Sequence, residues 1–184
     1  MEYLLETKHL LIRKTTVEDC GYFSDWEKRP EVSAFFSIDE DRDYAEVVRE
    51  FIVRETDDSK RQFTIVLRET EQPVGRIYLS RIDKRSDSCD ITRIYIADAS
   101  LRGKGYGEEA LRALLDHCFL NLHTERVTLD HFTGNHVAAA LYAKIGFSYE
   151  GIARNAAKKD GRYYDLHLMS MLRSEFFERV HKEQ

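Results

Sequence analysis

The sequence contains no run of about eighteen apolar residues, the length a helix needs to cross a bilayer, so a membrane span is excluded. Its opening stretch, MEYLLETKHLLIRK, carries charges inside the apolar segment and has no small-residue cleavage site, so we expect no secretory leader. Basic residues do not predominate, because 28 Lys and Arg stand against 33 Asp and Glu for a net charge of −5. We therefore expect neither a nucleic-acid nor a membrane partner.

Cysteine, proline and glycine are scarce. The three cysteines, Cys20, Cys89 and Cys118, are odd in number and far apart, which argues against a disulfide framework and for reduced thiols in a cytoplasmic compartment. Two prolines and nine glycines leave few enforced breaks, and no linker, repeat or low-complexity segment interrupts the 184 residues. We expect a single domain over residues 1–184, long enough to bury a core.

Hydrophobic periodicity predicts strands and helices in alternation. The expected strands are 9–14, 62–67, 74–82, 89–97, 127–130, 148–157 and 162–172. The expected helices are one capped by Thr15 or Thr16 and three that cover 41–56, 107–120 and 135–144. Gly146 suits a left-handed helix end, and Asp160-Gly161 suits a hairpin turn. This order predicts an α/β (α+β) fold with a mixed, mostly antiparallel sheet flanked by helices, not a doubly wound parallel sheet.

The few glycines are unevenly placed, because Gly103, Gly105 and Gly107 fall within five residues. They lie between an expected strand and an amphipathic helix. Glycines there let successive backbone N–H groups turn toward one concavity, and the helix start adds a positive dipole end. With Arg102 and Lys104 at its rim, the segment is typical of a pyrophosphate-binding loop.

Two nucleotide-binding motifs do not fit this cluster. A Walker loop needs four residues between its glycines and then Gly-Lys-Ser/Thr, but here Lys104 precedes Gly105 and no Ser or Thr follows. The dinucleotide fingerprint needs G-x-G-x-x-G near an N-terminal strand, whereas this G-x-G-x-G lies deep in the chain. A glycine-rich turn that merely caps the next helix remains an alternative.

Two segments together resemble the GNAT (GCN5-related) N-acetyltransferase superfamily. Arg102-x-x-Gly105-x-Gly107 resembles its Arg/Gln-x-x-Gly-x-Gly/Ala signature, and the block from Asn135 to Phe147 resembles Asn-x-x-Ala-x-x-Leu-Tyr-x-Lys-x-Gly-Phe. The order of elements matches over nearly the whole chain. The resemblance implies acetyl-coenzyme A (acetyl-CoA) as co-substrate and a twisted sheet whose central strands splay apart.

The resemblance also implies which residues hold the cofactor. Its pyrophosphate would lie on the glycine loop, and main-chain groups of the preceding strand would line its pantetheine arm. These residues are Arg102, Gly103, Lys104, Gly105, Tyr106, Gly107 and Glu108 in the loop, Tyr95, Ile96 and Ala97 in the strand, and Asn135 as a further contact. Asn135 has an equally strong interpretation as a plain helix N-cap.

The strand before the glycine loop changes its apolar phase, because Ile91 has one parity and Ile94 and Ile96 have the other. A bulge would explain this slip, since one extra residue switches the face that follows. GNAT domains resemble this arrangement, with a bulged strand that splays from its neighbour. A strand buried on both faces would explain the pattern equally well.

Tyr142 is the expected general acid. It lies seven residues, or about two helical turns, after Asn135 and shares its helix face. A phenol with a pKa of about 10 stays protonated at neutral pH yet can protonate a departing thiolate. The family's matching tyrosine has this role, whereas without the resemblance such a residue is more often a packing residue.

The sequence leaves the general base open. In the branch of the family that acts on protein N-termini or polyamines, a carboxylate often stands where this chain has Thr92. Asp90, two residues away on the same nominal face, is the candidate catalytic base. A chain of water molecules that deprotonates the amine is the alternative.

We expect no metal. His131 and His136 are five residues apart, but no cysteine or carboxylate stands at ligand spacing beside them. Cys118 falls on the apolar face of its helix, which predicts a core thiol and not a nucleophile.

These features predict an N-acetyltransferase that moves an acetyl group from acetyl-CoA to a primary amine by direct attack in a ternary complex. Segments 146–154 and 160–166 resemble the subgroup of ribosomal-protein N-terminal and spermidine N-acetyltransferases, which implies a protein N-terminus or a polyamine-like acceptor. The acidic segment 39–43 could attract such a cation, or be a solvated loop. The alternatives are a non-catalytic CoA-binding or sensor module and an antibiotic-modifying acetyltransferase. Many relatives form dimers, so a homodimer is a further expectation.

Overall fold

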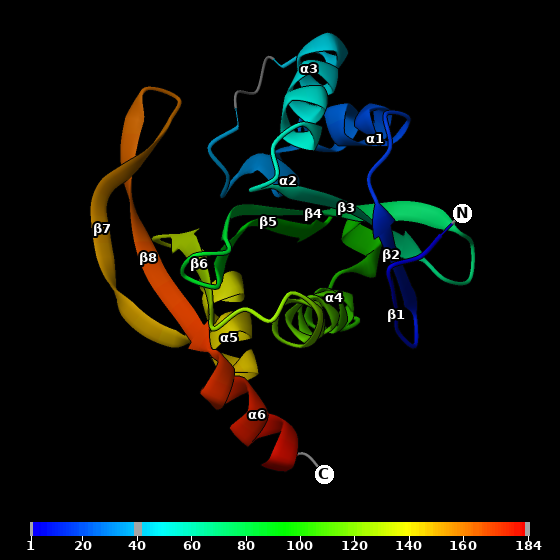
Figure 1. The fold of residues 1–184 in the computed structure, drawn as a ribbon. Helices are drawn as coiled ribbons and strands as arrows, with labels where there is room; N and C mark the ends of the chain where they lie inside the picture. Colours follow the sequence, from blue (N-terminus) through cyan, green and yellow to red (C-terminus); the bar gives the residue numbers. More distant parts are fainter. Residues whose placement is uncertain (1, 39–41, 183–184) are drawn as a thin grey trace.

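The structure, a computed structural model, describes residues 2–38 and 42–182 (Figure 1). Its strands are β1 (Leu5–Glu6), β2 (Leu10–Lys14), β3 (Arg61–Leu67), β4 (Gln72–Asp83), β5 (Ser88–Ile96), β6 (Arg126–Phe132), β7 (Ser148–Lys159) and β8 (Arg162–Leu172). They form one sheet in the order β1-β2-β3-β4-β5-β6-β8-β7. All neighbouring strands are antiparallel except β5 and β6, which confirms the expected mixed, mostly antiparallel sheet.

Helices cover both faces of the sheet. They are α1 (Asp19–Trp26), α2 (Pro30–Ser33), α3 (Tyr44–Glu55), α4 (Tyr106–Asp116), α5 (His136–Ile145) and α6 (Arg173–Lys182), and a π-helical turn, His117–Asn121, continues α4. Figure 1 shows α1 and α3 on one face of the sheet and α4 and α5 on the other. Within residues 2–38 and 42–182, no helix is long and apolar enough to cross a bilayer.

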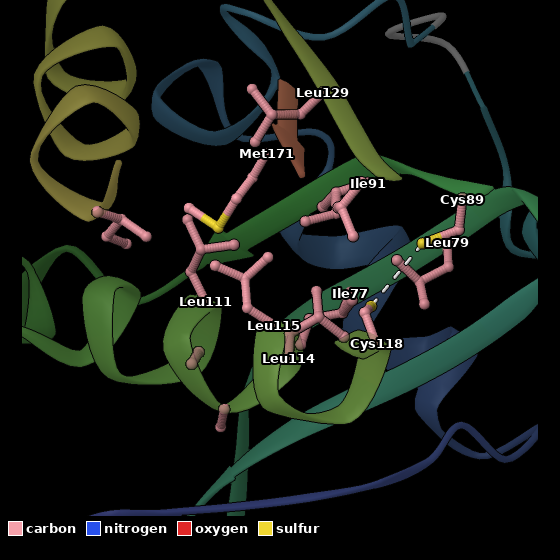
Figure 2. Close-up of a cluster of buried hydrophobic side chains, with 14 of the residues drawn as sticks. Ile77, Leu79, Cys89, Ile91, Leu111, Leu114, Leu115, Cys118, Leu129 and Met171 are labelled. Atoms are coloured by element: carbon pink, nitrogen blue, oxygen red, sulfur yellow. Dashed lines mark hydrogen bonds between the residues drawn. The ribbon is translucent and has the colours of Figure 1, made fainter. Parts of the chain in front are cut away.

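The main core lies between α4 and the middle of the sheet. Leu111, Leu114 and Leu115 project from α4 toward Ile77 of β4 and Ile91 of β5 (Figure 2), and all five side chains are buried. Their spacing is the apolar stripe expected for the helix after the glycine loop. The stripe therefore fixes α4, and with it the glycine loop at its start, against the sheet.

Cys118 is part of this core, as predicted. It is fully buried, and its sulfur lies 3.8 Å from that of Cys89 on β5 (Figure 2). Contact with Cys89 and burial raise the pKa of the Cys118 thiol well above its ordinary value. A buried thiol with a raised pKa is a poor nucleophile.

A bulge in β5 explains the change of apolar phase. Tyr78 of β4 lies opposite Arg93, but the next residue, Leu79, lies opposite Ile91, so Thr92 is the extra residue. The hypothesis of a bulge is confirmed, and the alternative of burial on both faces also holds locally, because the consecutive residues Cys89, Asp90 and Ile91 are all buried. Ile91 and Ile94 thereby reach the same core face.

The parallel pairing of β5 and β6 is short. It joins only Ser88, Cys89 and Asp90 to Arg126, Val127 and Thr128, although both strands continue further. We call the point beyond Asp90 and Thr128, where the two strands are no longer paired, the split. Its position next to the bulge confirms the expected splayed centre of the sheet.

Turn residues behave as their types predict. Gly146 ends α5 at φ 113°, and Asp160 and Gly161 turn the β7–β8 hairpin with φ of 50° and 74°. Two positive φ values are those of a tight hairpin turn. The second expected helix begins at Tyr44 and not at residue 41, because the Asp43 side chain accepts the Glu46 N–H and caps it.

A buried ion-pair network attaches α1 to the sheet. The Glu27 carboxylate lies 2.7 Å from Arg76 of β4 and 3.0 Å from Arg93 of β5, and it accepts a hydrogen bond from the Tyr95 hydroxyl at 3.0 Å. All three charged side chains are at least nine-tenths buried. Burial opposes ionisation of Glu27, but the charges of Arg93 and Arg76 outweigh it and lower its pKa.

Candidate functional site: the glycine cradle and the split between β5 and β6

The glycine cradle, residues 102–108, is an open nest of backbone donors. Gly103 and Gly105 have φ of 74° and 85°, and a Cβ at either would meet no atom within 4 Å. Within the described part of the chain, the N–H groups of residues 103–108 donate no hydrogen bond, and the first bond into α4 comes from Glu109. Consecutive free N–H groups at a helix start are suited to a pyrophosphate.

The other cradle side chains lie around this nest. Arg102 and Lys104 are exposed, and Arg102 donates from Nη2 to the Glu31 carbonyl oxygen of α2 at 3.0 Å. Glu108 pairs with Lys144 of α5 at 2.5 Å, which lowers the pKa of its carboxyl. Arg102 and Lys104 can therefore add positive charge, whereas Glu108 holds α4 to α5.

Tyr106 and Glu109 attach the first turn of α4 to His9, the residue before β2. The Tyr106 ring lies 5.6 Å from the His9 ring, between centroids. The Glu109 carboxylate accepts the His9 backbone N–H at 2.7 Å and lies 2.8 Å from its Nδ1. These contacts hold the start of α4, and therefore the cradle, against the segment at His9.

The three predicted main-chain contacts, Tyr95 and Ile96 of β5 and the following Ala97, do not all face the split. Ala97 donates its N–H to the Val74 carbonyl oxygen of β4 at 2.8 Å. The Tyr95 carbonyl also points to β4, because it lies 2.3 Å from where a Cβ on Gly75 would be. Since peptide groups alternate along a strand, Ile96 between them directs its N–H and C=O toward the split.

Tyr142 is held in α5 beside the split. Its ring lies between those of His131 and Phe147, with centroid distances of 6.2 and 5.9 Å. The side chain is buried, yet its hydroxyl makes no hydrogen bond to any described residue. Burial and the nearby charge of Asp130 raise its pKa to about 12, so it is protonated at neutral pH.

Asp130 of β6 is the site residue that sequence reasoning missed. It is half-buried, and no described residue donates a hydrogen bond or forms an ion pair with its carboxylate. Burial, reinforced by the charge of Asp90, raises its pKa. The sequence does carry a signal for it. Asp130 follows the buried Val127 and Leu129 with the opposite parity, so it lies on the opposite face of β6.

Asp90 lies at the closed end of the split, and it differs from Asp130. Its Oδ1 accepts the Thr92 hydroxyl at 2.9 Å, its Oδ2 accepts the Thr128 hydroxyl at 2.8 Å, and Arg81 lies 3.4 Å from Oδ2. The side chain is only 4% exposed. The candidate base of the sequence is therefore fixed by three partners.

Asn135 caps α5, because its Oδ1 accepts the Ala138 N–H at 3.2 Å. Its side-chain amide donates to no described residue. The cap interpretation of Asn135 is thus confirmed, and the cofactor contact that the resemblance implies stays a prediction.

The histidines do not gather metal ligands. His131 stacks on His167 of β8 at 5.0 Å, between centroids, with the rings 3° from parallel. Among residues 2–38 and 42–182, no three His, Cys, Asp or Glu side chains come together as a metal site.

In the acidic segment 39–43, residues 39–41 lie outside the described residues, and Asp43 serves as the cap of α3.

The sequence matches the family model described as "Acetyltransferase (GNAT) domain" over residues 9–148. The chain is 27% identical over 178 residues to the uncharacterized N-acetyltransferase p20 of Bacillus licheniformis, covering 94% of this chain and 97% of p20. It is also 28% identical to the L-amino acid N-acetyltransferase AaaT of Escherichia coli over 76 residues, 41% of this chain and 47% of AaaT.

A solved structure with the same fold is the spermidine N-acetyltransferase of Vibrio cholerae in complex with CoA and spermine. Its TM-score is 0.84 at 21% sequence identity, covering 93% of this chain and 99% of that one. The cradle described above fits the pyrophosphate of acetyl-CoA, because its free N–H groups and left-handed glycines make an anion-binding nest at a helix start. The chain therefore belongs to the GNAT acetyltransferase family, and it is an acetyl-CoA-dependent acyltransferase.

Proposed function

We propose that this chain moves the acetyl group to a primary amine by direct attack in a ternary complex, with Tyr142 as general acid and Asp130 as general base. The observation that carries this proposal is that both groups lack a protein partner beside the split. A buried hydroxyl or a half-buried carboxylate without a partner costs stability. Catalytic use accounts for that cost.

The cofactor would be held by the cradle. Acetyl-CoA supplies an acetyl group that is already activated as a thioester. The free N–H groups of residues 103–108 would bind its pyrophosphate, with Arg102 and Lys104 adding charge. The peptide groups of Ile96, which face the split, would bind and orient the arm that carries the acetyl group, and the amide of Asn135 is a further candidate contact.

Asp130 would accept the proton that an acceptor ammonium must lose. A carboxylate with a raised pKa is a stronger base than an ordinary one, and burial and Asp90 raise the pKa of Asp130. The side chain lies on the face of β6 away from α4, opposite the face on which the Tyr142 ring packs against His131. We therefore place the acceptor on the α1 side of the sheet.

Tyr142 would supply the proton for the departing thiolate. Its pKa of about 12 means that it keeps the proton throughout the neutral range. A thiol titrates near 8.5, so negative charge on sulfur would be stabilised by the phenol hydroxyl until the proton is transferred. The hydroxyl is available because no described residue uses it.

The acceptor that we propose is a protein N-terminus or a polyamine-like small molecule of the cytoplasm. The net charge of −5 suits a cationic acceptor. The structural neighbour described above binds spermine, whereas AaaT is named for L-amino acids. We further propose that residues 1–184 act as one domain, which is supported by the single sheet that joins β1 to β8.

Thiol release from acetyl-CoA with a panel of amines tests this function. The panel contains spermidine, peptides with free N-termini, amino acids and an aminoglycoside, and we expect turnover with a peptide or a polyamine. Tyr142→Phe should lower kcat by about 10²-fold or more, the usual contribution of a general acid. Tyr163→Phe, which removes an exposed hydroxyl from β8, is the matched control. An unchanged rate in Tyr142→Phe would remove Tyr142 as the acid.

A further inference from the structure

We infer that Asp90 is a positioning residue for Asp130, and that its fixed negative charge makes Asp130 a better acceptor for the proton of the amine. This inference rests on the proposed function, which makes Asp130 the base. In the step concerned, an N–H bond of the acceptor ammonium breaks and an O–H bond forms on Asp130. The nitrogen lone pair that remains is then free to attack the acetyl group.

The register of the sheet brings the two carboxylates together. Asp90 is paired with Thr128 in the last parallel pair before the split. Asp130 follows Thr128 by two residues, so it lies on the same face and about 7 Å further along β6. Asp90 and Asp130 therefore lie on adjacent strands, one at each side of the start of the split.

The hydrogen bonds of Asp90 form a directed chain. A carboxylate only accepts, so Thr92 donates its hydroxyl proton to Asp90 and must accept from Ser80, whose oxygen is 2.6 Å away. Thr128 donates to the other oxygen of Asp90. Both oxygens thus accept hydrogen bonds, which is the arrangement of an ionised carboxylate held in one place.

Asp130 has none of these partners. The charged groups that act on it are Asp90 from β5 and Arg81 from β4, and Tyr142 of α5, on the other face of β6, feels its charge across the strand. On β8 its neighbour in register is the uncharged Leu168. The remaining charged pair on this face of β6, Arg126 with Glu150 of β7, is neutralised internally.

The two carboxylates therefore have opposite environments. Like charges that share a site push the proton onto the group with fewer hydrogen bonds, and here that group is Asp130. Burial and the charge of Asp90 raise the pKa of Asp130, and Arg81 lowers it in part. Asp90 would act through Asp130 and need not touch the acceptor.

Carboxyl ¹³C NMR of Asp130 in the full chain tests this relation without any substrate. In Asp90→Asn the like charge is lost, so Asp130 should titrate about one pH unit lower than in the wild type. Thr128→Val is the matched control, because it removes one hydrogen bond from Asp90 but keeps its charge. Its Asp130 should titrate within about 0.3 pH units of the wild type, well below the like-charge effect. An unmoved Asp130 titration in Asp90→Asn would overturn the inference.

Arg81→Gln provides a second variant that does not disturb the interior, since the Arg81 side chain is 74% exposed. Removing this cation should move the Asp130 titration upward, opposite to Asp90→Asn. If Asp90→Asn does not fold, Asp90→Ser takes its place, because it removes the charge and keeps an oxygen for Thr92 and Thr128. Its Asp130 should also titrate lower than in the wild type, and an unmoved titration would contradict the inference.

The pH dependence of kcat with one acceptor adds the catalytic readout. The acidic limb should move to lower pH in Asp90→Asn, to higher pH in Arg81→Gln, and disappear in Asp130→Asn. A merely structural role of Asp90 would lower the rate and leave the limb in place. If no amine is acetylated but the NMR shifts occur, the proposed function fails while the relation between the carboxylates stands.

Discussion

At the scale of single residues, the cradle depends on the backbone conformation of two glycines, Gly103 and Gly105, and not on the small volume of glycine. Gly103 and Gly105 have positive φ, yet both face open space that could hold a side chain. A residue with a Cβ pays about 1–2 kcal/mol in this left-handed region. Glycine is therefore required at these positions to aim the N–H groups, and crowding plays no part.

Gly105→Ala tests this requirement. Strain at φ 85° should turn the N–H groups of the cradle away from their common focus and weaken CoA binding about tenfold, which corresponds to about 1.4 kcal/mol. Isothermal titration calorimetry with CoA measures the effect. Gly21→Ala in α1 is the control, because Gly21 has neither a positive φ nor a neighbour within 4 Å, and its CoA affinity should stay unchanged. Unchanged affinity in Gly105→Ala would contradict the cradle.

At the scale of elements, α5 depends on the cap at its first turn. Asn135→Ala removes the acceptor of the Ala138 N–H and should lower the free energy of unfolding by about 1 kcal/mol. Asn135→Ser restores a capping oxygen but not the side-chain amide, so urea unfolding should show near-wild-type stability. CoA affinity of the serine variant then tests the cofactor contact. A loss there would assign the amide to the cofactor, and retained affinity would leave Asn135 a cap alone.

Elements with a local signal were predictable from the sequence. The slip in parity between Ile91 and Ile94 indicated the bulge in β5, and Asp160-Gly161 indicated the hairpin, because both patterns act within a few residues. The four-residue α2, the two-residue β1 and the C-terminal α6 were not predicted. The first two are too short to show a periodicity, and tertiary contacts decide them.

The site shows the same division between local and long-range signals. The cradle was predictable because its glycines are contiguous, although the resemblance was needed to name its ligand. The role of Asp130 was not predictable, because it depends on the parallel register that places Thr128 beside Asp90. That register joins residues far apart in the chain, and the alternation of β6 alone shows only which face Asp130 occupies.

For the molecule as a whole, the two faces of the sheet are stabilised differently. The α4 face is an apolar core, whereas the α1 face combines a smaller apolar cluster with the buried ions Glu27, Arg76 and Arg93. Buried ions add stability only while each has its partner. Tyr95 also donates to Glu27, so the network connects α1 to the strand that borders the split.

The pH dependence of stability follows from this network. The pKa of Glu27 is lowered in the folded state, because Arg93 and Arg76 outweigh the effect of burial. A carboxyl with a lowered folded pKa contributes its full stability above its unfolded pKa, about 4.3, and loses it as the pH falls through the folded value. We therefore expect the free energy of unfolding to fall below about pH 4, and the fall should be smaller in Glu27→Gln.

Glu27→Gln should also be costly at neutral pH. It keeps the shape of the side chain but leaves Arg76 and Arg93 without a buried counter-charge, so urea unfolding should show a loss of about 3–5 kcal/mol. Glu6→Gln is the matched control, since its partner Arg68 lies 2.9 Å away and both side chains are exposed, and the loss should stay below about 1 kcal/mol. If the two variants lose equal stability, α1 is not held by its buried charges. The apolar contacts of Phe23 and Trp26 would then be what fixes this face.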